Sequence, residues 1–137
     1  MQPRLAEPFN WRVRVYYEDT DLGGVVYYAN YLKFLERARS EWLRHLGVSQ
    51  SRLLAEEGVL FAITGVEIRY LQPARFEDEL LVTVVLERMR RASMSFRQTI
   101  LRQGDEAELL CTARVTAACL RADGMRPTAF PPHLFDK

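Results

Sequence analysis

A chain of 137 residues and 15.9 kDa has room for one domain and not for two. Its 19 basic and 18 acidic residues leave a net charge of +1, which excludes the strong positive field of a typical nucleic-acid-binding protein. Hydrophobic residues make up 48% and charged residues 27%, as in soluble globular proteins, and no apolar run approaches the roughly 20 residues of a membrane span. We therefore expect a cytoplasmic protein without a transmembrane segment, with association at the inner membrane kept as an alternative.

The first half of the chain predicts one strand and two helices. Apolar and polar residues alternate over 11–18, which indicates a strand with one solvated face. After a turn at 19–24, apolar residues recur every three or four positions and predict an amphipathic helix over 28–46, closed by Gly47. Ser49 is then the expected N-cap of a short second helix that ends at Gly58.

The second half predicts strands joined by turns, at 60–70, 79–89, 93–102 and 108–121. Cys111 and Cys119 lie eight residues apart on the last strand, too far for a disulfide, so we expect two buried free thiols. The remaining segment, 123–137, is rich in proline and is expected to be extended.

The strand at 79–89 is apolar on both faces, whereas one long helix can cover only one face of a sheet. The sequence therefore predicts a single α+β domain over 1–137, with its core at about 11–122. In it a curved antiparallel sheet of about five strands wraps around one central helix, and a second subunit or an added element covers the other face. We expect a homo-oligomer.

Three carboxylates, Glu18, Asp19 and Asp21, fall within four residues just before the long helix. In a structural interpretation, Asp19 caps the turn and Asp21 lies near the positive end of the helix dipole. In a functional interpretation, free N–H groups at the helix start polarise a carbonyl, and a carboxylate beside them attacks it or activates a water molecule. Metal binding by the three acids is a weaker alternative, because they lack the spacing of a ligand loop.

Other catalytic patterns are missing from the sequence. The two histidines, His45 and His133, lie near no nucleophile motif, and there is no G-x-S-x-G, C-x-x-C, H-E-x-x-H or glycine-rich phosphate loop. We predict neither a metal nor a cofactor. Arg90 and Arg91 fall on a predicted strand connection, where they are either a solvated tip or a clamp for a phosphorylated ligand.

Several of these segments resemble one known family. The segments are Val15-Tyr16-Tyr17-Glu18-Asp19-Thr20-Asp21, Gly23-Gly24-Val25-Val26-Tyr27, Glu36-Arg37-Ala38-Arg39 and Tyr70-Leu71-Gln72-Pro73-Ala74-Arg75. Together they resemble the hotdog-fold acyl-CoA thioesterases of the 4-hydroxybenzoyl-CoA thioesterase-like class. Within that class they are most similar to the bacterial thioesterases associated with the Tol–Pal system. The likeness extends from about Trp11 to Pro131.

This resemblance implies a role for five residues. Asp21 matches the catalytic carboxylate of the family, and the N–H of Tyr28 matches the carbonyl polariser. That branch commonly has histidine at the position of Tyr28, but a backbone donor does not depend on its side chain. Arg90, Arg91 and Ser93 match positions that bind the nucleotide of CoA, although the branch often has a small residue at Arg91. The family also implies a site at a dimer interface.

The function expected from the sequence is hydrolysis of acyl-CoA to free acid and CoA, with short-chain aliphatic or aromatic acyl groups and Asp21 as nucleophile or general base. The expected assembly is a homodimer or homotetramer. The alternative is a non-catalytic subunit that binds acyl thioesters and interacts with acyl carrier protein or an inner-membrane complex. A hotdog dehydratase is disfavoured, because it needs a histidine and none occurs between Trp11 and Arg44.

Overall fold

The computed structural model describes residue 5 and residues 7–135 of the chain; the ends of the predicted domain and tail, at 1–4, 6 and 136–137, lie outside the described residues. In chain order the elements are β1 (Phe9–Arg14), the 3-10 helix η1 (Tyr17–Asp19), α2 (Asn30–His45), α3 (Gln50–Glu57), β2 (Val59–Tyr70), β3 (Glu79–Met89), β4 (Ser93–Arg102), β5 (Glu108–Arg121) and β6 (Arg126–Pro127).

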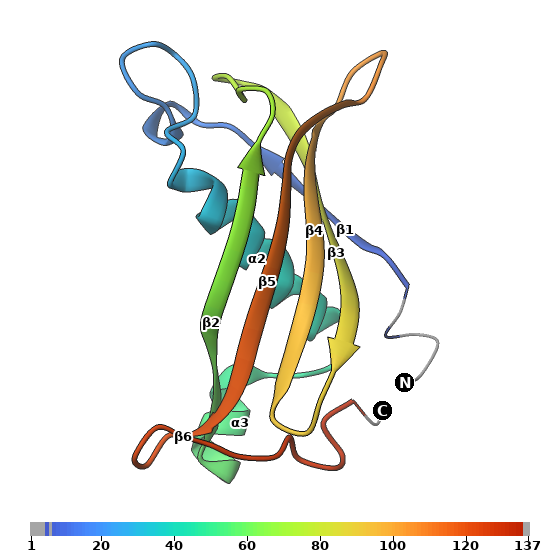
Figure 1. The fold of residues 1–137 in the computed structure, drawn as a ribbon. Coiled ribbons are helices and arrows are strands. Elements are labelled where there is room, and N and C mark those ends of the chain that lie inside the picture. Colours follow the sequence, from blue (N-terminus) through green and yellow to red (C-terminus); the bar gives the residue numbers. More distant parts are fainter. Residues whose placement is uncertain (1–4, 6, 136–137) are drawn as a thin grey trace.

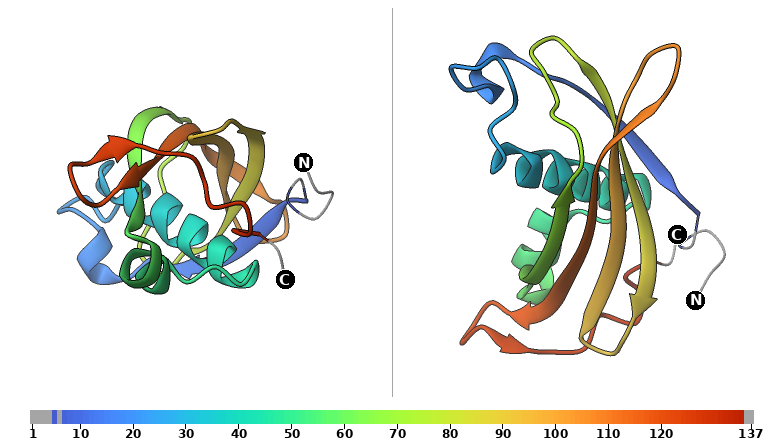
Figure 2. Two further views of the ribbon diagram at one scale, coloured as in Figure 1. Left: turned by 90° about the horizontal axis from the view of Figure 1, so that it is seen from below. Right: turned by 45° about the horizontal axis from the view of Figure 1, so that its top comes forward.

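The strands form one antiparallel sheet in the order β1-β3-β4-β5-β2, and the short β6 pairs with the end of β5. The sheet curves, and α2 runs across its concave side (Figures 1 and 2). This is the α+β arrangement predicted from the sequence. Strand β2 lies at one edge of the sheet, beside α3, and β1 lies at the other.

The core lies between α2 and the concave face of the sheet. One face of α2 is buried, with Tyr31, Phe34, Leu35, Ala38, Trp42 and Leu43. Alternate residues of β3 meet it, namely Leu80, Val82, Val84 and Leu86. The outward residues Leu81 and Val85 of β3 are only partly buried, so the single chain leaves part of the convex face uncovered.

Most predicted boundaries agree with the structure, but the predicted C-terminal end of the first strand is wrong. It was expected to reach residue 18, whereas β1 ends at Arg14 and Tyr17–Asp19 form a 3-10 turn. Val15 stays buried although it leaves the sheet, because its N–H donates to Asp78 O (2.9 Å) and its carbonyl accepts from Glu77 N (3.0 Å). The alternating pattern of apolar residues therefore continues along the chain beyond the end of β1.

The segment after β5 turns back across the end of the sheet. Thr128 N donates to Cys119 O (2.9 Å), and Phe130 N donates to Arg91 O (3.0 Å). Phe130, Leu134 and Phe135 are buried, and the Phe135 ring lies 5.8 Å from that of Trp42. The tail thus adds to the core near the C-terminal end of α2.

Candidate active site

Asp21 lies in a tight turn between η1 and α2. Its Oδ1 accepts a hydrogen bond from Gly23 N (2.8 Å), and its N–H donates to Val25 O (2.9 Å). Gly24, with φ of 78°, supplies the left-handed residue that the turn needs, and Thr20 bridges to Val26 at its base. The turn therefore holds the Asp21 carboxylate in one place while leaving it exposed to solvent.

Asp19 has a different environment from Asp21. It is buried, and its carboxylate accepts from Tyr16 N (2.9 Å) and from Asn30 Nδ2 (2.8 Å). These bonds join the turn to the first residue of α2, so Asp19 has the capping role predicted in the structural interpretation. Within the described residues no group of three or more histidine, cysteine or acidic side chains is placed to hold a metal ion.

The start of α2 has no cap. Asn30 N donates to Tyr27 O (2.8 Å) and Tyr31 N to Tyr28 O (3.3 Å), but the N–H groups of Tyr28 and Ala29 have no acceptor among the described residues. The first turn holds no acidic residue. Free N–H groups at a helix start form a partial positive charge that attracts an anion or a polarised carbonyl oxygen.

The turn and the helix start are close neighbours. Tyr27 N donates to Asp19 O (3.2 Å), so the chain returns beside its own acid cluster before the helix begins. Asp21 lies in the hairpin that the Thr20–Val26 bridge closes, and Tyr28 follows that bridge by two residues. Acyl transfer needs a carboxylate and amide donors near one carbonyl group, and this short segment holds both kinds of group.

A second loop, at 73–78, packs against this hairpin and is hydrogen-bonded to it. Val26 N donates to Ala74 O (2.8 Å), Ala74 N donates to the hydroxyl of Tyr31 (2.9 Å), and Phe76 N donates to Gly24 O (3.2 Å). The loop is held in turn by Arg102, whose Nε donates to Asp78 (2.9 Å). Sequence reasoning missed this support, and Pro73 was its only local signal.

Aromatic side chains surround the helix start. The rings of Tyr27 and Tyr28 lie 4.7 Å apart, and the Tyr70 hydroxyl donates to Tyr28 O (3.2 Å). Tyr28 is 60% exposed and Tyr17 is 79% exposed. A single chain therefore leaves several aromatic side chains exposed around the start of α2 and the adjoining end of the edge strand β2.

Arg90, Arg91 and Ser93 lie on the hairpin between β3 and β4, as predicted. Arg90 N donates to Ser93 O (2.7 Å), and both arginines are exposed. This hairpin is at the opposite end of β3 from the 73–78 loop, about 33 Å away at roughly 3.3 Å per residue. One chain therefore does not bring these residues to Asp21.

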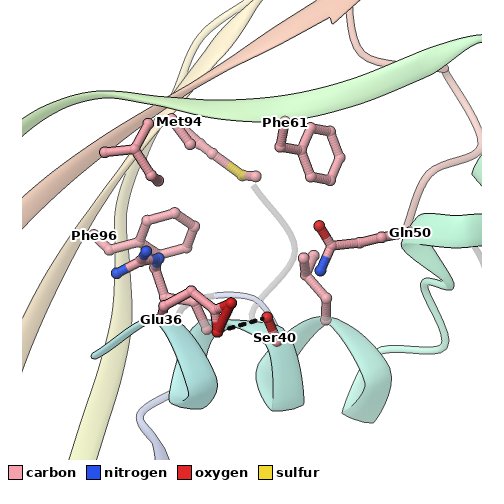
Figure 3. Close-up of a pocket in the computed structure, with 10 residues that line it drawn as sticks. Glu36, Ser40, Gln50, Phe61, Met94 and Phe96 are labelled. Atoms are coloured by element: carbon pink, nitrogen blue, oxygen red, sulfur yellow. Dashed lines mark hydrogen bonds between the residues drawn. The ribbon is translucent and has the colours of Figure 1, made fainter. Parts of the chain in front are cut away.

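A cavity of about 170 Å³ lies between α2 and the sheet (Figure 3). Its apolar lining comes mainly from Phe61 and Ile63 of β2 and from Met94 and Phe96 of β4. Its polar lining comes from Glu36, Arg39 and Ser40 of α2 and Gln50 of α3; the Ser40 hydroxyl donates to Glu36 (3.3 Å). Sequence reasoning missed the cavity, because its walls come from five separate elements, α2, α3, β2, β4 and β5.

Comparisons with known proteins identify the family. The model of the thioesterase-like superfamily matches residues 15–137. The acyl-CoA thioester hydrolase YbgC of Escherichia coli O6:H1 is 46% identical over 123 residues, which are 90% of this chain and 90% of that protein. The chain therefore belongs to the thioesterase-like superfamily, as its motifs predicted.

Solved structures confirm the hotdog fold. The structure of a probable thioesterase from Bartonella henselae has a TM-score of 0.84 and 34% identity, and the match covers 91% of this chain and 100% of that one. The 4-hydroxybenzoyl-CoA thioesterase from Pseudomonas sp. strain CBS-3 has a TM-score of 0.83 at 22% identity, over 93% of this chain and 94% of that one. None of the helices in the described part of the chain is long and apolar enough to cross a membrane.

Proposed function

We propose that this protein is an acyl-CoA thioesterase and that the hairpin of Asp21 and Tyr28 is its catalytic centre. The observation that carries the proposal is that one short segment, from Asp21 to the start of α2, holds both an exposed carboxylate and two free N–H groups. The family and the 46% identity to an acyl-CoA thioester hydrolase support the same reaction. The whole chain acts as one domain in this proposal.

The Tyr28 N–H donates to the thioester carbonyl oxygen and stabilises the negative charge that develops there. As a nucleophile, Asp21 attacks the carbonyl carbon, the C–S bond breaks, and CoA thiolate leaves and takes a proton from water. Water then hydrolyses the acyl-aspartyl anhydride. As a general base, Asp21 instead takes a proton from a water molecule that attacks the same carbon; the C–S bond then breaks, and the CoA thiolate leaves and takes the proton from Asp21. The geometry is compatible with both routes.

A homodimer completes this site. Strand β2 is a 12-residue edge strand, and exposed edges of this length favour pairing with another strand. If two copies pair β2 antiparallel about a two-fold axis, the Tyr70 end of one strand meets the Val59 end of the other. Tyr70 contacts Tyr28, so the catalytic hairpin of one subunit faces the opposite end of its partner.

The same symmetry brings in the predicted CoA-binding residues. Ser93 pairs with Ala118 of β5, which pairs with Ala62 of β2, so the β3–β4 hairpin is level with the first residues of β2. Arg90, Arg91 and Ser93 of the partner subunit then lie at the catalytic end of this chain. There the two guanidinium groups bind the phosphates of CoA.

The cavity supports short-chain aliphatic or aromatic acyl groups as substrates. Its volume of about 170 Å³ exceeds only slightly the 150 Å³ or so of an engineered cavity that holds benzene. A partner such as acyl carrier protein, in place of CoA, would present the same thioester without the nucleotide. Hydrolysis of acyl-CoA but not of acyl carrier protein thioesters would support CoA as the physiological carrier.

The test is the hydrolysis of acyl-CoAs, from acetyl to benzoyl and decanoyl, measured by released thiol. In the Asp21→Asn variant we expect kcat to fall about 10³-fold, the scale of a lost catalytic base, with unchanged thermal unfolding. Glu18→Gln is the matched control, because Glu18 is an exposed acid of the same turn. A wild-type chain that binds acyl-CoA without hydrolysing any of them is instead the scaffold of the alternative hypothesis.

A further inference from the structure

Among the residues that the structure describes, Arg39 is the one cation that lines the cavity between α2 and the sheet. Its Nη1 donates to Oε1 of Gln98 (2.9 Å), and Gln98, which is fully buried, donates in turn to Leu35 O (3.1 Å). Within the described part of the chain the guanidinium makes no other hydrogen bond and no ion pair. Gln98 therefore fixes the orientation of Arg39 and uses only one of its donors.

The remaining donors of Arg39 are open to solvent at the border of the cavity, because Arg39 is only partly buried and no buried side-chain nitrogen or oxygen of the described residues lacks a partner. A guanidinium group carries five N–H donors and no acceptor, so a ligand oxygen in the cavity can replace water on these donors. Burial lowers the pKa of Arg39 below its usual value, and the nearby Glu36 carboxylate opposes that shift. A guanidinium group keeps its charge in proteins, and the unused donors of Arg39 border a space whose other walls are mostly apolar.

The cavity restricts what such an acceptor can be. Phe61, Ile63, Met94 and Phe96 favour an apolar body, and the volume fits about six carbon atoms. Glu36 lies three residues before Arg39 on α2 and also lines the cavity, so it would repel a second carboxylate there. An uncharged carbonyl oxygen at the end of a short apolar chain satisfies both conditions.

We propose that the cavity binds the tail of the acyl group and that Arg39 is a specificity-determining residue, which hydrogen-bonds a carbonyl oxygen near the end of that tail. The inference rests on the proposed thioesterase activity and the two-fold pairing of β2. In that pairing, the Phe61 and Ile63 side of the partner's cavity faces the catalytic hairpin. The preferred substrates are therefore oxoacyl-CoAs with the keto group far from the thioester.

The experiment compares matched pairs of acyl-CoAs with tails of six, eight and ten carbons, each as the plain alkyl chain and with a keto group on the penultimate carbon. We expect the wild-type kcat/KM to favour the oxo member of at least one pair about tenfold, as for a hydrogen bond to a charged group. In the double variant Arg39→Met/Gln98→Met we expect the ratio to fall to about one.

The double variant is chosen to preserve the fold. Removing Arg39 alone would leave Oε1 of the buried Gln98 without its partner, whereas replacing both residues with apolar ones of similar length removes both ends of that bond. Leu35 O also loses the Gln98 donor, but it lies inside α2, where a helix carbonyl accepts from the N–H four residues on. Arg37→Met is the matched control, since Arg37 is an exposed arginine of the same helix that does not line the cavity. It should keep the wild-type ratio.

A second variant tests the cavity without altering Arg39. Ala117 of β5 lines it, and Ala117→Val narrows it, so the rate for ten-carbon tails should fall relative to that for six-carbon tails. An oxo preference that survives in the double variant, or that no wild-type pair shows, overturns the role of Arg39. Absence of any wild-type hydrolysis overturns the proposed function instead, so the two failures are distinguishable.

Discussion

The two ends of α2 are built differently. At the C-terminal end, Val48 N donates to Leu43 O and Gly47 N to Arg44 O, both at 2.9 Å, and Gly47 has a φ of 86°. This is a Schellman motif, which satisfies the last carbonyls. Arg44 and His45 in the last turn also match the negative end of the dipole. At the N-terminal end there is no side-chain cap and no acid in the first turn.

This contrast fits our proposal that the N-terminal end of α2 is kept open for the substrate. Three acidic residues precede α2, yet Asp19 binds the Asn30 side chain and Asp21 binds Gly23 N, so neither fills the free N–H groups of the helix. A cap there would add about 1 kcal/mol of stability. The absence of a cap here is consistent with the general observation that active sites are often less stable than they could be, because their geometry serves function.

The largest expected effect on stability comes from removing the hydrogen bonds that hold the turn at residues 16–19 against the uncapped N-terminal end of α2. Asp19→Ala removes the acceptor of Tyr16 N and of Asn30 Nδ2 in a buried place. We expect the free energy of unfolding to fall by about 3 kcal/mol, the cost of two lost hydrogen bonds to a charged group. Because the same bonds hold the turn against the helix, kcat should also fall, at temperatures where the variant is folded.

Urea unfolding and thiol release measure the two effects of Asp19→Ala separately. Asp123→Ala is the control, since Asp123 is an exposed acid in the turn between β5 and β6. If the Asp19→Ala variant is as stable as the wild type, the hydrogen bonds of Asp19 to Tyr16 N and Asn30 Nδ2 contribute nothing to the free energy of unfolding.

A smaller effect is expected at the closed end. Gly47→Ala places a side chain at a left-handed backbone position, which costs about 1 kcal/mol. The melting temperature should fall by roughly 4 °C. Because Gly47 belongs neither to the Asp21 turn nor to the lining of the cavity, kcat measured at 25 °C should not change. A loss of activity beyond that of the unfolded fraction would mean that the two ends are coupled.

The sequence predicted the elements well where the signals are local. Turn residues predicted the ends of the helices, at Gly47, Ser49 and Gly58. The alternation of apolar and polar residues, together with the turns between them, predicted the bounds of β3, β4 and β5. The turn at Asp21 was also readable, because its chemistry depends on neighbouring residues. The early end of β1 was not, since Val15 is held by Glu77 and Asp78, more than sixty residues further along the chain.

The parts of the site that the sequence did not reveal all depend on contacts between distant segments. Three features join elements that no local pattern in the sequence connects. They are the hydrogen bond from Val26 N to Ala74 O behind the Asp21 turn, the pairing of Arg39 with Gln98, and the cavity. The separation of Arg90 from Asp21 is likewise a consequence of strand length and topology. A motif gives the residue types of a site, but not which subunit or which end of a sheet supplies them.

The smallest expected effect tests how precisely the open end is positioned. Tyr70→Phe removes the hydroxyl that donates to Tyr28 O and keeps the ring beside Tyr31 (5.2 Å). Since Tyr70 is 44% exposed, water replaces the bond, and stability should change by less than about 1 kcal/mol. The peptide that begins at Tyr28 loses an anchor, however, so kcat should fall a few-fold while KM stays constant. Tyr16→Phe, at an exposed tyrosine that is 61% accessible, is the control. An unchanged kcat in Tyr70→Phe would mean that the helix start is held by α2 and the 73–78 loop alone.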